Sequence, residues 1–305
     1  MNRRHFLRNG VLAGAAVSAT ATVFGKENKK IKQADKPFNL DYAFHDGMFK
    51  NHGGNDFIDQ IKFAYDKGFR SIEDNGMTGR PVEQQTKIGE TLAKLGMKMG
   101  VFVVPKGGNS ANSLAAGKKE YIDIFLQGCR QTVEVAKRVN AKWVTVVPGD
   151  FERNLPIGIQ TGHVIDALKR GAEILEPQGI IMVLEALSDT PNLFLRTTDQ
   201  AYEICRGVNS PSCKVLYDTY HMQKNEGNLI KNIELAWDEI AYFQIGDNPG
   251  RNEPTTGEIN YKNVFKYIHG RGYRGIMGME HGNSKPGKEG ELALIEAYRI
   301  SDSFL

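Results

Sequence analysis

The sequence predicts an α/β fold, a single (β/α)₈ TIM barrel, over residues 37–305. Eight short, β-rich apolar runs alternate with longer segments of helical period as far as the C-terminus. Glycines stand where a helical segment ends and the next apolar run begins. No Pro- or Ser-rich linker divides this region, and barrels of about 250 residues commonly form one domain. One catalytic domain is therefore expected.

The predicted strands are short and mostly apolar. They cover residues 39–44, 69–73, 97–104, 142–147, 180–185, 214–218, 241–245 and 275–280. The fourth and fifth contain continuous apolar runs, which are typical of parallel strands covered on both faces. This pattern favours a closed sheet with helices outside it.

The clearest predicted helix covers residues 118–139. A stripe at three- and four-residue steps is expected to face the sheet; it comprises Tyr121, Ile124, Gly128, Thr132, Val135 and Val139. Left-handed helix ends are expected at Gly68, Gly96, Gly179 and Gly272. No GxGxxG or GxxxxGK[ST] sequence follows an early strand, which argues against dinucleotide and P-loop sites.

The N-terminus has the pattern of an export signal. Arg3 and Arg4 precede Phe6 and Leu7, and residues 10–24 are uncharged and rich in small side chains. This resembles a twin-arginine signal, so we expect a signal peptide at 1–21, a disordered spacer at 22–36, and export to the periplasm by the twin-arginine machinery. The alternative is a short membrane anchor, but the segment is shorter than the ~20 apolar residues of a stable membrane span.

Charge and cysteine content exclude other classes. The chain has a formal net charge of +3, and Arg3, Arg4 and Arg8 supply three positive charges before residue 22 with no acid there. The rest is therefore near neutral, without the basic character of a nucleic-acid binder. The three cysteines, Cys129, Cys205 and Cys213, have no metal-type spacing and imply no disulfide framework.

Four consecutive predicted strands end in an oxygen donor. Glu185, Asp218, Gln244 and Glu280 close the fifth to eighth strands, and strand C-termini meet at the mouth of a (β/α)₈ barrel. Converging carboxylates repel one another unless a cation lies between them. We therefore predict one divalent metal ion held by these four residues, Mg²⁺ or Mn²⁺ by the hardness of the ligands, with Co²⁺ also possible.

Several segments resemble hydroxypyruvate isomerase and the wider xylose isomerase-like family of sugar isomerases and epimerases. The resemblance lies in the residues after the sixth and seventh strands, 218–223, 243–247, 249–254 and 256–261. It implies that Glu185, Asp218, Gln244 and Glu280 bind the metal, that Glu185 and Glu280 are also the catalytic acid and base, and that His221 and Arg251 contact substrate.

The chain departs from the family pattern in the pocket. Ala186 stands where the family usually has Pro, Tyr242 where it has His, and His281 where it often has Tyr. Glu73, at the end of the second strand, is a further substrate-binding candidate. These changes are expected to line the pocket, so they bear on the substrate rather than on the metal site.

The residues favour proton transfer next to a carbonyl group. Isomerising a hydroxy-carbonyl compound requires a base, an acid and a way to stabilise an enediolate, and two carboxylates beside a metal provide them. We therefore expect a metal-dependent isomerase or epimerase of a small sugar or hydroxy-keto acid, with a keto-sugar 3-epimerase, lyase or dehydratase as the alternative. A barrel-type DNA-repair endonuclease and a non-catalytic carbohydrate-binding protein are the rivals from other classes, and a homo-oligomer is left open.

Replacing Arg3 and Arg4 together by Lys should stop export by the twin-arginine route, because that pathway reads the arginine pair. We expect the double variant to remain in the cytoplasm with its signal uncleaved, measured by cell fractionation and the mass of the protein. Lys26→Arg, beyond the predicted cleavage site, is the control. Normal processing of the double variant would contradict the twin-arginine assignment.

Overall fold

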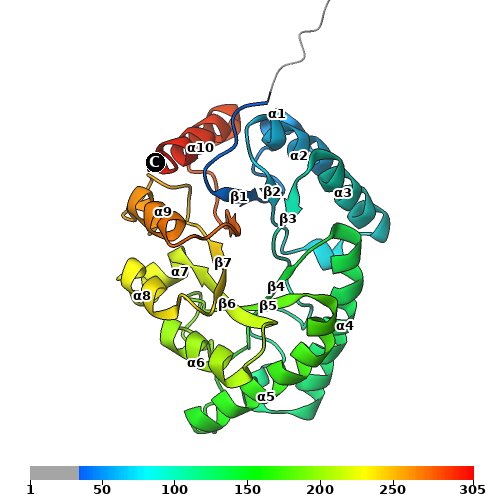
Figure 1. Cartoon of the computed structure of the whole chain (residues 1–305). Helices are drawn as coiled ribbons and strands as arrows, with labels where there is room; N and C mark the ends of the chain where they lie inside the picture. The colour runs from blue at the N-terminus through cyan, green and yellow to red at the C-terminus, as the bar shows by residue number, and fades with distance from the viewer. Residues whose placement is uncertain (1–33) are drawn as a thin grey trace, which may run out of the picture. The chain divides into compact units, whose positions relative to one another are not determined.

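Eight parallel strands form the inner wall of the protein, as shown by a computed structural model that describes residues 34–305 (Figure 1). They are β1 Asp41–Phe44, β2 Ser71–Ile72, β3 Lys98–Met99, β4 Trp143–Val146, β5 Ile181–Glu185, β6 Cys213–Asp218, β7 Ile240–Gln244 and β8 Ile276–Gly278. Their order in the sheet is β3-β2-β1-β8-β7-β6-β5-β4. Each predicted strand overlaps the observed one, and the (β/α)₈ barrel is confirmed.

The segment that follows β3 joins the two ends of the sheet. Lys98 and Met99 pair with β2, and Val103 then forms a bridge with Thr145 of β4. The Thr145 N–H donates to the carbonyl of Phe102 at 2.8 Å, and the Val104 N–H donates to the carbonyl of Thr145 at 3.0 Å. The predicted strand 97–104 therefore pairs with one neighbour at its start and with the other at its end.

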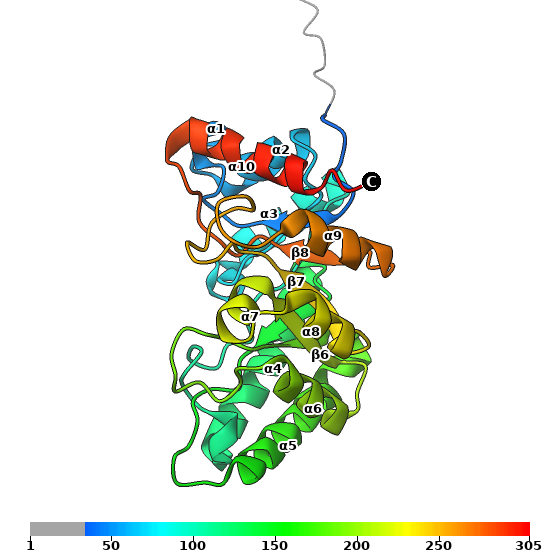
Figure 2. The same cartoon turned by 90° about the vertical axis from the view of Figure 1, so that its left-hand side faces the viewer.

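Helices surround the strands on the outside, and Figure 2 shows the same ring from the side, with α10 and α9 toward one end of the view and α5 and α6 toward the other. Their bounds are α1 Lys50–Gly53, α2 Phe57–Asp66, α3 Val82–Leu95, α4 Lys119–Val139, α5 Ile157–Leu175, α6 Thr198–Val208, α7 Thr219–Asn225, α8 Leu229–Ala236, α9 Tyr261–Gly270 and α10 Gly287–Ser301. Successive helices α3, α4, α5 and α6 pack side by side.

Four of the six positions predicted for the buried stripe of α4 are confirmed. Gly128, Thr132, Val135 and Val139 are buried, whereas Tyr121 is half-buried and Ile124 is 41% exposed. The buried stripe begins instead at Phe125 and Leu126. The left-handed helix ends are confirmed at all four glycines, with φ between 65° and 98°.

The barrel interior contains a small apolar layer beneath the strand C-termini. It is formed by Ala43, Val101, Val183, Leu216, Tyr242 and Ile276. A much larger apolar cluster fills the space between strands and helices. The strand ends are thus supported from below and from outside, which holds their polar side chains in fixed positions.

None of the helices within residues 34–305 is long and apolar enough to cross a membrane. The predicted signal peptide and most of the predicted spacer lie outside the described residues.

Candidate active site and metal centre

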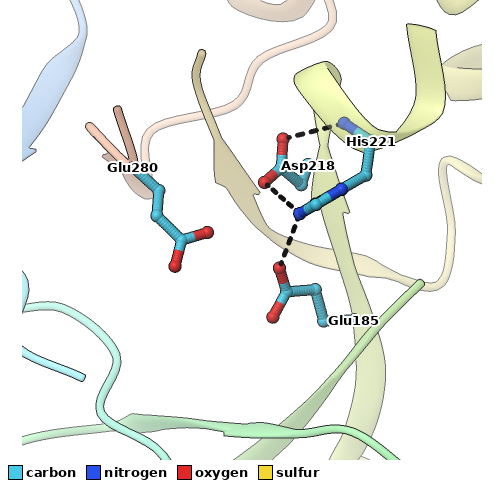
Figure 3. Close-up of side chains that lie close together, drawn as sticks. All are labelled: Glu185, Asp218, His221 and Glu280. Carbon is cyan, nitrogen blue, oxygen red and sulfur yellow. Dashed lines mark hydrogen bonds and ion pairs between the residues drawn. The ribbon is translucent and has the colours of Figure 1, made fainter. Parts of the chain in front are cut away.

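Three of the predicted ligands come together at the carboxyl ends of the strands. Glu185 ends β5, Asp218 ends β6, and Glu280 follows β8 by two residues. Together with His221 of α7 they offer ligand atoms that all lie within 4.8 Å of one another. Figure 3 shows Glu280 facing the other three side chains from the opposite side of the cluster.

The register of the sheet explains why these side chains share one face. Asp218 pairs with Gln244 and Gln244 pairs with Gly278, while Glu185 pairs with Leu216. The ligand positions are therefore separated by even numbers of residues along the ladder. Side chains alternate between the two faces of a strand, so all of them point into the barrel.

Asp218 uses its two carboxylate oxygens differently. Oδ1 accepts from the backbone N–H groups of Tyr220 at 2.7 Å and His221 at 3.4 Å, which caps α7. Oδ2 is buried and receives no hydrogen bond from the described residues. One oxygen therefore begins the helix that carries His221, and the other faces the cluster.

The arrangement fits a bound cation. In the described part of the chain, seven buried side-chain oxygens lack a hydrogen-bond partner, and three of them belong to predicted ligands: Glu185 Oε1, Asp218 Oδ2 and Gln244 Oε1. Buried oxygens normally find a donor. An oxygen-rich set of this kind suits Mg²⁺ or Mn²⁺.

The two glutamates differ in their hydrogen bonds. Glu280 Oε1 accepts from the side-chain amide of Asn75 at 2.7 Å, and Oε2 accepts from Arg251 at 3.1 Å. Glu185 Oε1 has no hydrogen-bond donor among the described residues, and it lies 3.8 Å from His221 Nε2. Glu280 is therefore the better stabilised as a carboxylate.

The pKa values follow from burial and like charge. Burial, then the negative charges of Glu280 and Asp218, raises the pKa of Glu185 well above its ordinary value. Burial, then Asp218 and Glu73, raises the pKa of Glu280 to about 7, although Arg251 lowers it. A cation within the cluster would remove the repulsion that underlies part of both shifts.

His221 is fully buried and is oriented by Ser188. The backbone N–H of Ser188 lies 3.1 Å from Nδ1, and its hydroxyl lies 2.7 Å from the same atom. Burial lowers the pKa of His221 against the opposing effect of Asp218, which favours the neutral ring. Since a backbone N–H can only donate, Nδ1 accepts, and the proton of the neutral ring is on Nε2.

Arg251 reaches the same place from the loop between β7 and α9. Its guanidinium lies 3.1 Å from His221 Nε2 and 3.7 Å from Asp218 Oδ2, and it also covers the ring of Tyr220 at 4.9 Å. The guanidinium and the His221 ring are both donors when the neutral ring carries its proton on Nε2, so this 3.1 Å approach is not a hydrogen bond. The two N–H groups can instead donate to an acceptor placed between them.

Glu73 lies elsewhere than expected. Its side chain has no exposed surface and accepts hydrogen bonds from Gln244 and Tyr242, with His45 at 3.1 Å. It is behind Gln244 rather than in the open pocket, so the structure does not support the expected substrate contact. Burial lowers the pKa of His45, but the hydrogen bond and charge of Glu73 outweigh it and raise the pKa overall.

Sequence reasoning missed Asn75 and Ser188. Each follows a strand-end glutamate by two or three residues, a position at the barrel mouth, and this spacing was the only signal available. Both are short polar residues of ordinary loop type, so nothing marks them until the hydrogen bonds are known.

Comparisons with known proteins identify the family of the chain. The model of the family described as "Xylose isomerase-like TIM barrel" matches residues 61–300. Hydroxypyruvate isomerase of Escherichia coli K12 is 28% identical over 257 residues, which cover 81% of this chain and 95% of that protein. The 2-oxo-tetronate isomerase of Cupriavidus necator is 30% identical over 258 residues, covering 82% and 95%.

A solved structure shows the same fold at low identity. The structure described as an AP endonuclease, family 2, from Brucella melitensis superposes with a TM-score of 0.70 at 23% identity, covering 85% of this chain and 99% of that one. At this identity the likeness concerns the fold alone.

The metal-free protein should lose stability as pH rises toward 7. Glu280 has a folded pKa of about 7 against an ordinary value of 4.5, so its contribution is fully present below about pH 4.5 and is lost as pH rises through 7, an upper bound of about 3 kcal/mol. Mn²⁺ should raise the melting temperature more at pH 8 than at pH 5.5, where protons compete for the same oxygen.

Thermal unfolding with EDTA or millimolar Mn²⁺ at both pH values measures this. Asp218→Asn, which retains an oxygen to cap α7, should greatly reduce the Mn²⁺ effect. An Mn²⁺ shift that is absent, or larger at pH 5.5, would contradict the metal centre.

Proposed function

Because the chain belongs to the xylose isomerase-like TIM barrel family, we propose that it is a metal-dependent isomerase or epimerase of a small hydroxy-carbonyl compound. One observation carries the proposal: two glutamates, the buried Glu185 and the largely buried Glu280, face a common space from the end of β5 and from just after β8. The similarity to hydroxypyruvate and 2-oxo-tetronate isomerases over most of their length supports a small hydroxy-keto acid as substrate.

The proposed reaction moves one proton through an enediolate. A carboxylate takes the proton from the hydroxyl-bearing carbon beside the carbonyl, the electron pair of that C–H bond forms a C=C bond, and the π pair of the carbonyl moves to its oxygen. An acid then delivers a proton to the former carbonyl carbon, while the hydroxyl proton passes to the former carbonyl oxygen, so the hydroxyl-bearing carbon becomes the new carbonyl. Glu280 is the base in this scheme, because Asn75 and Arg251 stabilise its carboxylate form. Glu185 has no such donors, and burial together with the charges of Glu280 and Asp218 raises its pKa well above its ordinary value, which suits the acid.

Glu185, Asp218, Gln244 and Glu280 would hold one divalent ion, Mg²⁺ or Mn²⁺, with Co²⁺ as a substitute. When bound, such an ion supplies Lewis-acid stabilisation of negative charge on substrate oxygens. The N–H groups of His221 and Arg251 donate to the same side of the substrate. His221 acts as a donor rather than as a ligand in this proposal, because Ser188 fixes its proton on Nε2.

An alternative substrate is a keto-sugar. A cavity of about 570 Å³ is lined by residues that include His45 and Asn51, after β1, and His281 and Asn283, after β8. It includes none of the predicted ligands, although His281 directly follows Glu280. This volume is within the range of pockets that enclose a whole small-molecule ligand, and it leaves room for more than a three-carbon acid. A keto-sugar 3-epimerase, or a lyase or dehydratase that begins with the same proton abstraction, is therefore the second candidate.

Location bears on the choice of substrate. We propose export by the twin-arginine route from Arg3 and Arg4, which lie outside the described residues. An exported enzyme would meet free sugars and glycosides rather than cytoplasmic metabolites. Activity on a panel of hydroxy-keto acids and keto-sugars, with metal added or chelated, separates the two candidates and also the rival binding and endonuclease functions.

Replacing Glu185 or Glu280 by Gln should separate metal binding from turnover. The amide keeps an oxygen for the metal but cannot carry the proton, so activity should fall by about 10²–10⁴-fold, the usual contribution of general acid–base catalysis. In deuterated water, Glu185→Gln should still exchange the substrate proton that Glu280 removes, whereas Glu280→Gln should not. Steady-state kinetics, metal content and NMR of recovered substrate measure the three quantities.

Glu239→Gln provides the matched control, because this buried glutamate binds Lys214 and Arg206 at the opposite end of β7 and carries no proton in the scheme. A Glu280→Gln enzyme with bound metal and near-normal turnover would contradict the proposed mechanism.

A further inference from the structure

The carboxylate of Glu73 is completely enclosed by hydrogen-bond donors. Oε1 accepts from the side-chain amide of Gln244 at 2.5 Å, and Oε2 accepts from the hydroxyl of Tyr242 at 2.8 Å. His45 Nε2 lies 3.1 Å from Oε1. Glu73 follows β2 while Gln244 ends β7, so this contact crosses the inside of the barrel between strands that are not neighbours.

Two glycines leave the space for this arrangement. A Cβ atom at Gly278 of β8 would lie 1.7 Å from Glu73 Oε2, and a Cβ at Gly100 would lie 2.3 Å from the hydroxyl of Tyr242. Any other residue at Gly278 would displace the Glu73 carboxylate. The barrel interior is thus shaped around the Glu73–Tyr242 pair.

The ring of Tyr242 lies in the apolar layer beneath the site, and its hydroxyl reaches Glu73 above that layer. Its ring is fully buried among Val101, Leu216 and other members of that layer, and the backbone N–H of Val101 approaches its oxygen at 3.4 Å. The hydroxyl proton is therefore free to be donated to Glu73. A histidine at this position, as in the family pattern, would fill a different volume and donate from a different point.

The enclosure determines which way the Gln244 amide points. A carboxylate only accepts hydrogen bonds, so the NH₂ group of Gln244 faces Glu73 and Oε1 faces away from it. Gln244 Oε1 is buried and without a partner among the described residues. An amide oxygen binds a hard cation, whereas an amide NH₂ does not.

We propose that Glu73 is a positioning residue that makes Gln244 an oxygen ligand, and that Tyr242 holds Glu73 in place for this task. The inference rests on the metal site of the proposed function. Partners of this kind orient metal ligands, and losing one typically lowers metal affinity by about 10–100-fold.

The decisive experiment exchanges the two side chains. Glu73→Gln offers an NH₂ group to Gln244, so the Gln244 amide can turn its oxygen toward position 73 and its NH₂ toward the metal; Mn²⁺ affinity should fall by about 10–100-fold. Adding Gln244→Glu should restore affinity to within a few-fold of the wild type. The amide now at position 73 can donate to one oxygen of the carboxylate now at position 244, while the other oxygen binds Mn²⁺. Isothermal titration with Mn²⁺ alone gives both affinities without any substrate.

Two variants guard against a general loss of structure. Glu239→Gln is the matched control and should leave Mn²⁺ affinity unchanged. Glu239 is also a buried glutamate near β7, but it lies at the opposite end of the strand, where it binds Lys214 and Arg206. Tyr242→Phe removes one donor to Glu73 and should lower Mn²⁺ affinity less than Glu73→Gln does. Melting temperatures in EDTA report on the fold of each variant.

The outcomes distinguish this inference from the proposed function. If the wild type binds no Mn²⁺, the metal site itself fails and the inference falls with it. If the wild type binds Mn²⁺ and Asp218→Asn weakens it, but Glu73→Gln binds as tightly as the wild type, the metal site stands and the role of Glu73 is overturned. Weak binding by Glu73→Gln that the exchange does not relieve also overturns it, since Glu73 would then serve only the fold.

Discussion

The concentration of negative charge at one end of the barrel is the constraint on which the rest of the site depends. Glu73, Glu185 and Asp218 are almost completely buried, and Glu280 stands beside them with a side chain 20% exposed. Burying unpaired carboxylates is costly, and their mutual repulsion adds to the cost.

The hydrogen bonds around these carboxylates reduce this cost. Glu73 is satisfied by neutral donors and His45, Asp218 by the first turn of α7, and Glu280 by Asn75 and Arg251. Glu185 alone is left without a donor among the described residues. In the register it pairs with Leu216, two residues before Asp218. Because it lacks a hydrogen-bond donor, a proton or a cation must compensate its charge.

The sequence predicted the strand ends well because two simple rules apply there. Apolar runs mark the strands, and a polar residue at the C-terminal end of such a run usually lies at the mouth of the barrel. This is enough to find Glu185, Asp218 and Gln244. Glu280 was assigned to the end of a strand, although β8 stops at Gly278, and the even spacing still turns it toward the site.

The remaining contacts depend on distances across the barrel, which no local pattern encodes. Glu73 has the same sequence signature as the ligands, a carboxylate closing an apolar strand, yet it contacts Tyr242 and Gln244 from β7 and not the open pocket. What separates it from a ligand is the absence of a side chain at Gly278, on a third strand. Three segments far apart in the sequence must be placed together before the difference can be seen.

Arg251 shows a second way in which position is set, by a loop rather than by a strand. It adopts a left-handed backbone conformation, φ 50°, which is unfavourable for a residue with a side chain. Its N–H donates to the carbonyl of Asp247 at 2.7 Å and its carbonyl accepts from Gly282 at 3.0 Å. The loop is in turn held by two buried carboxylates: Asp247 accepts from the N–H groups of Gly257 and Ile259, and Glu253 binds Ser284.

The carboxylates that would hold the metal lie at the ends of strands or just after them, and the whole barrel fixes the register of these strands. Arg251 instead lies on a loop whose shape is fixed by its own hydrogen bonds. A change of loop sequence can thus alter the loop groups around the site while leaving Glu185 and Glu280 in place. For this reason we expect the departures Ala186 and His281, both in loops, to bear on the substrate rather than on the proposed proton transfer.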